Sequence, residues 1–102
     1  MAPLTLRLAS RALDQLYGIL DYIALDNPEA AERVAAKVER SLEKFRSFPE
    51  LGAQVFPGLP HREVKPYPRR IIYHRREDTV WIVAVMRTEP LLRPGSLEEP
   101  EA

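Results

Sequence analysis

The sequence predicts an α+β domain of order β-α-α-β-β-β, in which a helical hairpin packs on one face of a mostly antiparallel four-stranded sheet. Two amphipathic segments follow each other with only Asp26 and Asn27 between them, and three strand candidates then come in succession. Helices joined so tightly pack antiparallel, and strands with short links form a meander. The hairpin can bury its apolar stripes only against one face of that sheet.

The N-terminal elements are a strand and a helix. Leucine alternates with polar residues at Leu4, Leu6 and Leu8, which predicts a half-buried strand over about residues 3–8. Ser10 is expected to cap the helix that follows. That helix is predicted over residues 11–25, because apolar side chains recur at three- and four-residue spacing. They are Leu13, Leu16, Tyr17, Leu20, Ile23 and Ala24.

A second helix is predicted over residues 28–47. Asn27, Pro28 and Glu29 supply a cap, a first-turn proline and a first-turn acid, and Pro49 bounds the far end. Its apolar face holds Ala31, Val34, Val38, Leu42 and Phe45. The side chains that we expect to be buried are Leu16, Leu20, Val38, Leu42 and Val83.

The second half of the chain reads as a loop and three strands. Prolines and glycines predict a loop over residues 49–60, and short strands are expected over His61–Lys65 and Arg69–Arg75. Glu77-Asp78 indicates a hairpin turn. The β-branched run Thr79–Met86 is typical of a central strand buried on both faces. Residues 1–90 would then form one domain, and the acidic, proline-containing tail 91–102 is expected to be poorly ordered.

Composition narrows the class of protein. The 102 residues include no cysteine, which excludes disulfides and thiolate metal sites and fits a cytoplasmic location. We see no signal peptide and no apolar run long enough to span a membrane. No cofactor is expected, because a glycine-rich phosphate loop is missing. His61 and His74 lack the spacing of a metal-ligand motif, so no metal site is predicted.

Residues 61–76 concentrate positive charge on a chain whose formal net charge is zero. Glu63 is the only acid there, whereas the bases are Arg62, Lys65, Arg69, Arg70, Arg75 and Arg76. Such a local positive surface suggests a site that meets an anionic partner. The alternative is a strand edge protected by charges, which is common in sheet proteins.

Several segments, in this order and spacing, carry a resemblance to a known family. They are Asp21-Tyr22-Ile23 with Asn27-Pro28, Ala30-Ala31-Glu32-Arg33-Val34, Phe48-Pro49-Glu50-Leu51-Gly52, Arg62-Glu63-Val64, Arg70-Ile71-Ile72-Tyr73 and Val80–Met86. Over residues 3–90 the chain resembles the RelE/ParE superfamily of toxins. The resemblance implies a toxin of a type II toxin–antitoxin system, of the plasmid stabilisation type, that an antitoxin encoded beside it holds inactive.

Two activities occur in this superfamily. ParE-like members bind and poison DNA gyrase, and RelE-like members cleave mRNA on the ribosome. The long helical hairpin and the segments around Asn27-Pro28 and Phe48–Gly52 look more like the ParE side, which makes gyrase inhibition the leading hypothesis. A ribosome-dependent mRNA endonuclease is the alternative, and a toxin fold that has lost toxicity is a third. A homodimer remains open.

The resemblance also suggests site residues. For a nuclease they would be Arg70 as phosphate clamp, His74 as base and Arg87 as a second clamp, since arginine cannot act as a base. Ala84 stands where many relatives have an arginine, and no tyrosine or histidine follows Arg87. For a binding protein, contacts with the target or with nucleic acid are predicted at Arg62, Lys65, Arg69, Arg70 and Arg87.

Each of these candidate side chains also has an alternative interpretation. A lone strand histidine such as His74 is more often a surface residue, and Arg70 can equally point to solvent. Tyr67 and Tyr73 are alternative bases, although Tyr73 is better explained as a core residue whose hydroxyl reaches a polar edge. Strand alternation places Trp81 on a face with Val83 and Val85, where it is either buried in the core or an anchor for a partner.

Overall fold

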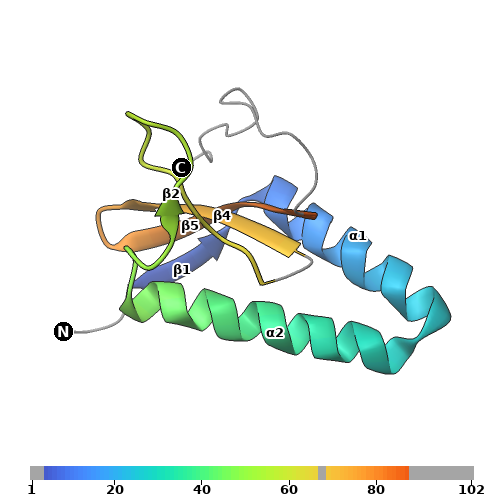
Figure 1. The fold of residues 1–102 in the computed structure, drawn as a ribbon. Helices are drawn as coiled ribbons and strands as arrows, with labels where there is room; N and C mark the ends of the chain where they lie inside the picture. Colours follow the sequence, from blue (N-terminus) through green and yellow to red (C-terminus); the bar gives the residue numbers. More distant parts are fainter. Residues whose placement is uncertain (1–3, 67–68, 88–102) are drawn as a thin grey trace.

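The structure is a computed structural model that describes residues 4–66 and 69–87. A helical hairpin lies against one face of a sheet and extends past its end (Figure 1). The elements are β1 (Thr5–Leu8), α1 (Ser10–Asp26), α2 (Pro28–Ser47), β2 (Ala53–Gln54), β3 (Arg62–Val64), β4 (Arg69–Arg76) and β5 (Thr79–Arg87). The predicted α+β architecture is confirmed, while Tyr67 and the tail 91–102 lie outside the described residues.

The sheet has five strands in the order β1-β5-β4-β3-β2, one more than predicted. The additional strand is β2, which lies in the segment predicted as a loop and pairs with β3 through Ala53 and Glu63. A two-residue strand is too short to carry an alternating pattern. The sheet is mixed, because β1 runs parallel to β5 with Thr5 opposite Thr79, whereas the other pairs are antiparallel.

The observed helix boundaries agree with the predicted ones to within one residue, but one predicted cap differs. The Asn27 side chain accepts a hydrogen bond from the Ala30 N–H at 3.1 Å, as expected for the cap of α2. The prediction that Ser10 caps α1 was wrong. Ala9 holds the cap position without a side-chain hydrogen bond, and Ser10 is already helical. Helix α1 therefore begins without the side-chain acceptor that favours helix N-termini.

The core lies between the helices and the sheet. Its central side chains from α2 are Val38, Leu42 and Phe45, and those from the sheet are Ile71, Tyr73, Val80, Ile82 and Val85. Burial of Val38, Leu42 and Val83 is confirmed, whereas Leu16 and Leu20 are only half-buried. Helix α1 leaves one flank in solvent, where Tyr17 is 56% exposed.

A β-bulge in β5 redistributes its side chains between the two faces. Ile72 lies opposite Ala84, but Tyr73 lies opposite Ile82, so Val83 is the extra residue. The bulge interrupts the strict alternation that sequence patterns assume.

The face without helices carries a smaller apolar cluster. It is built on Ile72, Val83 and Ala84, and Val55, Phe56, Trp81 and Met86 pack against it. Trp81 does share a face with Val83, but the prediction that Val85 joins them was wrong, because Val85 points into the helix-side core. Trp81 remains half-buried, with the Arg7 guanidinium 6.0 Å from its ring centroid.

Candidate functional site: a groove beside α1

The cations of the basic segment do not form one surface, because β4 sends alternate side chains to opposite faces. Ile71 and Tyr73 belong to the helix-side core, whereas Ile72 belongs to the outer cluster. Arg69 therefore lies on the helix side, and Arg70 lies on the outer face. The two neighbouring arginines face different surroundings.

Glu63 pairs with two of the predicted site residues. Its carboxylate forms a hydrogen-bonded ion pair with the Arg70 guanidinium, and both side chains are largely buried, at 12% and 13% exposed. The same carboxylate lies 3.6 Å from the Lys65 ammonium, which is 58% exposed. Arg70 therefore does not point freely to solvent, which was one of its two predicted placements.

Arg62 holds the loop that follows α2. Its guanidinium donates to the Gly52 carbonyl at 2.8 Å and to the Glu50 carbonyl at 3.4 Å. These hydrogen bonds hold the segment before β2 in place, so Arg62 stabilises the loop.

His74 is buried rather than on the surface, which makes the surface reading wrong. His74 and His61 are each 3% exposed, and their ring centroids lie 4.9 Å apart in a tilted arrangement. The pair lies on the outer face, because His74 alternates with Tyr73 along β4.

Tyr73 is a core residue whose hydroxyl reaches a polar group, as predicted. Its ring is fully buried and stacks on Phe45 with centroids 4.1 Å apart. The hydroxyl accepts a hydrogen bond from the Gly52 N–H at 2.8 Å. Burial raises the pKa of Tyr73 above its ordinary value of 10.0. A base at neutral pH needs a pKa shifted the other way.

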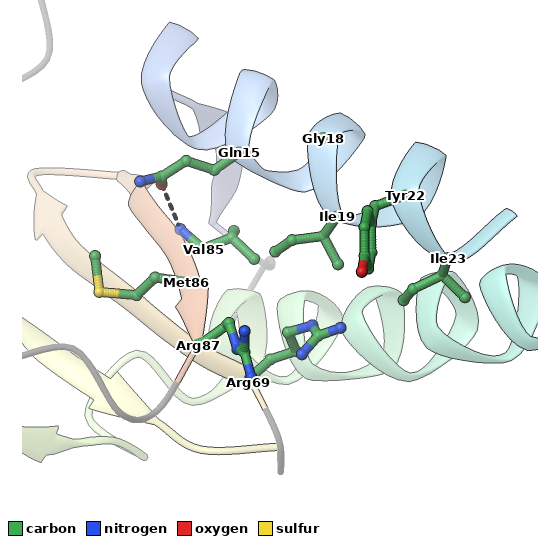
Figure 2. A pocket seen from close by; sticks show the side chains of 9 residues that line it. All are labelled: Gln15, Gly18, Ile19, Tyr22, Ile23, Arg69, Val85, Met86 and Arg87. Carbon is green, nitrogen blue, oxygen red and sulfur yellow. Dashed lines mark hydrogen bonds between the residues drawn. The ribbon is translucent and has the colours of Figure 1, made fainter. Parts of the chain in front are cut away.

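Arg69 and Arg87 are cross-strand partners at the open end of β4 and β5. They border a groove of about 600 Å³ between these strand ends and α1. Figure 2 shows the two guanidiniums side by side across from Ile19 and Ile23. We call this the α1 groove. Helix α1 lines it with Gln15, Gly18, Ile19, Tyr22 and Ile23, and the strands line it with Arg69, Val85, Met86 and Arg87.

The groove is apolar along its length and cationic at one side. Tyr22 is 78% exposed over it, and a methyl group added at Gly18 would meet nothing within 4 Å. Like charges directly opposite each other on two strands are destabilising, so folding alone does not favour placing Arg69 opposite Arg87. The buried Nε of Arg69 has no hydrogen-bond partner among the described residues.

Gln15 closes the exposed edge of β5 at the groove. The Val85 N–H donates to its side-chain oxygen at 2.9 Å (Figure 2). Strand β1 pairs with β5 only as far as Ile82, so this side chain satisfies a strand N–H that no neighbouring strand reaches. The groove floor is therefore fixed before any partner arrives.

The three nuclease candidates are not brought together. Arg70 and His74 lie on the outer face, whereas Arg87 lines the groove on the helix side with Arg69. A phosphate held at Arg87 would thus be on the opposite face of the sheet from His74. Clamp and base need a common reacting centre.

Sequence reasoning singled out Arg69 and Arg87 and predicted apolar grooves beside the helices, but it did not identify the α1 residues that line this groove. The available signals were Gly18 in the middle of a helix, where glycine is unfavourable, and Tyr22 beside the apolar stripe. Neither signal shows which strand ends lie opposite the helix.

Two other kinds of site find no support within residues 4–66 and 69–87. No group of three or more His, Asp or Glu side chains there could hold a metal ion. The two helices are not long and apolar enough to cross a membrane.

Comparison with known proteins gives the family. The family model "ParE toxin of type II toxin-antitoxin system, parDE" matches residues 6–91. A search of curated proteins finds no significant match. Among solved structures, the chain is similar to the chromosomal ParDE toxin–antitoxin system of P. aeruginosa, with a TM-score of 0.70 and 17% identity. That match covers 84% of this chain and 97% of the other.

A second solved structure has the same fold. It is the toxin–antitoxin complex RelBE2 of Mycobacterium tuberculosis, with a TM-score of 0.62 and 20% identity, covering 88% of this chain and 97% of that one. The family match spans most of the sequence and the described elements. The chain belongs to the ParE toxin family of type II toxin–antitoxin systems.

Proposed function

We propose that this toxin acts by binding and inhibiting DNA gyrase, and that its antitoxin neutralises it by occupying the α1 groove. The observation that carries the choice of gyrase over mRNA cleavage is the division of the nuclease candidates. His74 is buried on one face and Arg87 lies on the other. General base catalysis contributes about 10²–10⁴-fold to a rate, and the candidate base His74 lies on the opposite face of the sheet from the groove cations.

Tyr73, an alternative candidate base on β4, also fits a binding protein better than an enzyme. The Tyr73 hydroxyl accepts a hydrogen bond from the Gly52 N–H, and the raised pKa of Tyr73 is consistent with a neutral phenol at physiological pH. Arg70 forms its ion pair with Glu63. Arg69 and Arg87 lie opposite each other at this end of the sheet, where they can hold an acidic or phosphate group of a macromolecule.

Support for the antitoxin site comes from the shape and chemistry of the α1 groove. Ile19, Ile23 and Val85 offer an apolar wall, and Arg69 and Arg87 offer charge beside it. An amphipathic antitoxin segment can lay its apolar face in such a groove and direct an acid at the arginines. Both similar solved structures are of toxin–antitoxin systems. Occupying the groove would cover the same cations that meet the target.

The activity is tested with purified toxin in two assays run side by side. We expect inhibition of gyrase supercoiling and intact mRNA on translating ribosomes, with supercoiling restored by the product of the adjacent gene. Ribosome-dependent mRNA cleavage that His74→Ala abolishes would instead establish the nuclease. Activity in neither assay would indicate a toxin fold that has lost toxicity.

The antitoxin site is tested by co-purification with the product of the adjacent gene. We expect Arg69→Glu/Arg87→Glu to weaken the complex by at least about tenfold, because charged hydrogen bonds at an interface contribute about 1.5–3 kcal/mol each. The matched control Arg75→Glu/Arg76→Glu changes the same charges at the other end of β4. An unchanged complex in the first variant would place the antitoxin elsewhere.

A further inference from the structure

A second groove, on the other helix, has a different chemistry. It has a volume of about 410 Å³ and lies between the C-terminal half of α2 and the end of β3. Its cations are Lys37, Arg40, Lys44 and Lys65, and no acid is among the described residues that line it. We call it the α2 groove. It shares no lining residue with the α1 groove.

Charge on α2 is segregated into stripes. Lys37, Arg40 and Lys44 follow each other at three- and four-residue spacing, so they lie on one face of the helix and span about 10 Å along its axis. The acids Glu39 and Glu43 lie beside this stripe on the helix surface, and the Glu43 carboxylate pairs with the Arg46 guanidinium at 3.1 Å. Lys65, which directly follows β3, lies across the groove, and its ammonium lies 3.6 Å from the Glu63 carboxylate.

The floor between these cations is apolar. Its accessible part is formed by the half-buried Val64 and Pro66, and Leu51 at its edge is 53% exposed. Phe45 is fully buried against Tyr73, so its ring offers no platform on which a nucleic acid base could stack. An apolar floor within a basic rim matches an amphipathic protein segment better than a nucleic acid backbone.

We propose that the α2 groove is a second docking surface, which binds an acidic amphipathic helix of a partner protein. Acids at three- and four-residue spacing on that helix have the same period as Lys37, Arg40 and Lys44, so each can meet one cation. Lys65 bounds the other side of the groove. An apolar side chain of the partner enters between them beside Leu51. The inference does not depend on the target of the toxin or on the occupant of the α1 groove.

The test uses the purified full chain and a fluorescent helical peptide of about 18 residues, with glutamates on one helical face and leucines beside them. Binding is followed by anisotropy. We expect saturable binding that weakens as salt rises from about 50 to 300 mM, because screening shortens the reach of the charges. Arg40→Glu/Lys44→Glu should weaken it by at least about tenfold. Arg11→Glu/Arg33→Glu, with the same charge change on helix surfaces outside both grooves, should leave it unchanged.

Four results would overturn the proposal. They are no binding of the peptide, equal binding of its glutamine counterpart, equal binding of a single-stranded oligonucleotide of the same charge, and an equal loss on Arg69→Glu in the α1 groove. The third would make the groove a general polyanion site, and the fourth would join both grooves into one surface. Circular dichroism confirms folding, and the milder variants Lys44→Gln and Lys65→Gln repeat the test from two different elements.

Discussion

The two helices of the hairpin bury very different shares of their surface. Helix α2 places Ala31, Val38, Leu42 and Phe45 in the interior, whereas α1 fully buries only Ala12. Conversely, α1 leaves Tyr17, Tyr22 and Leu25 exposed at 56%, 78% and 86%. Helix α2 contributes more side chains to the core, and α1 leaves an apolar flank exposed.

Each helix also borders a groove, and the two grooves differ in the chemistry of their lining residues. The α1 groove is mainly apolar with two arginines from the strands, while the α2 groove is rimmed by cations from the helix itself. Because α2 buries one face in the core, only its opposite face is exposed to solvent, and that face is charged. A partly anchored helix can offer apolar side chains. The following variants test this division.

The largest effect on stability is expected at Leu42 in α2. Leu42→Ala removes a buried side chain from the centre of the core and should lower the free energy of unfolding by about 2–5 kcal/mol. Leu25→Ala in α1 is the matched control, because Leu25 is 86% exposed, and it should change stability by less than about 0.5 kcal/mol. Urea unfolding measures both. Equal losses would mean that α1 is anchored as firmly as α2.

A smaller effect is expected at Tyr73, which joins α2 to the loop after it. Tyr73→Phe leaves the buried Gly52 N–H without its acceptor and should lower the free energy of unfolding by about 1–3 kcal/mol at neutral pH. The exposed Tyr22→Phe in α1 should have almost no effect.

The pH dependence of Tyr73 gives a second readout. Its pKa is raised in the folded protein, so the neutral phenol is favoured there. This contribution to stability is complete below the unfolded pKa of about 10 and is lost as pH rises through the higher folded value. Unfolding measured from pH 8 to 11 should show an alkaline loss that is reduced in Tyr73→Phe. An identical alkaline slope in both proteins would contradict the assignment.

The smallest effect on stability, and the one of opposite sign, is expected at Gly18. Gly18→Ala adds a methyl group that meets nothing within 4 Å, so helix propensity should raise stability by about 0.5–1 kcal/mol. The same methyl group intrudes on the α1 groove and should weaken antitoxin binding severalfold. Asp21→Ala, on α1 outside the groove, should leave binding unchanged. Tighter antitoxin binding in Gly18→Ala would show that the partner does not pass over this residue.

The helices and the order of elements along the chain were predictable because hydrophobic periodicity and helix-capping residues encode them. The parallel pairing of β1 with β5 was not predicted. Asn27 and Pro28 mark the start of α2, and the run in β5 marks a central strand. The two-residue β2 and the bulge at Val83 were not predictable. Both are set by pairing with a neighbouring strand, and no local pattern reports that pairing.

The site was predictable only in part. Arg69 and Arg87 stood out as cations, but the ion pair of Arg70 with Glu63 depends on two strands meeting in one register. The burial of His74 beside His61 likewise depends on the segment before β3 lying over the outer face. The α1 groove combines a helix with strand ends more than forty residues away, so its shape is a property of the fold.

The affinity of the purified toxin for DNA gyrase tests the central claim most directly, because that claim is a binding function through the groove cations. We predict measurable binding that Arg69→Ala/Arg87→Ala weakens by more than about tenfold. Arg75→Ala/Arg76→Ala, the equivalent change at the other end of β4, should retain the affinity of the unmodified toxin. No binding by the unmodified toxin, or an equal loss in both double variants, would contradict the account.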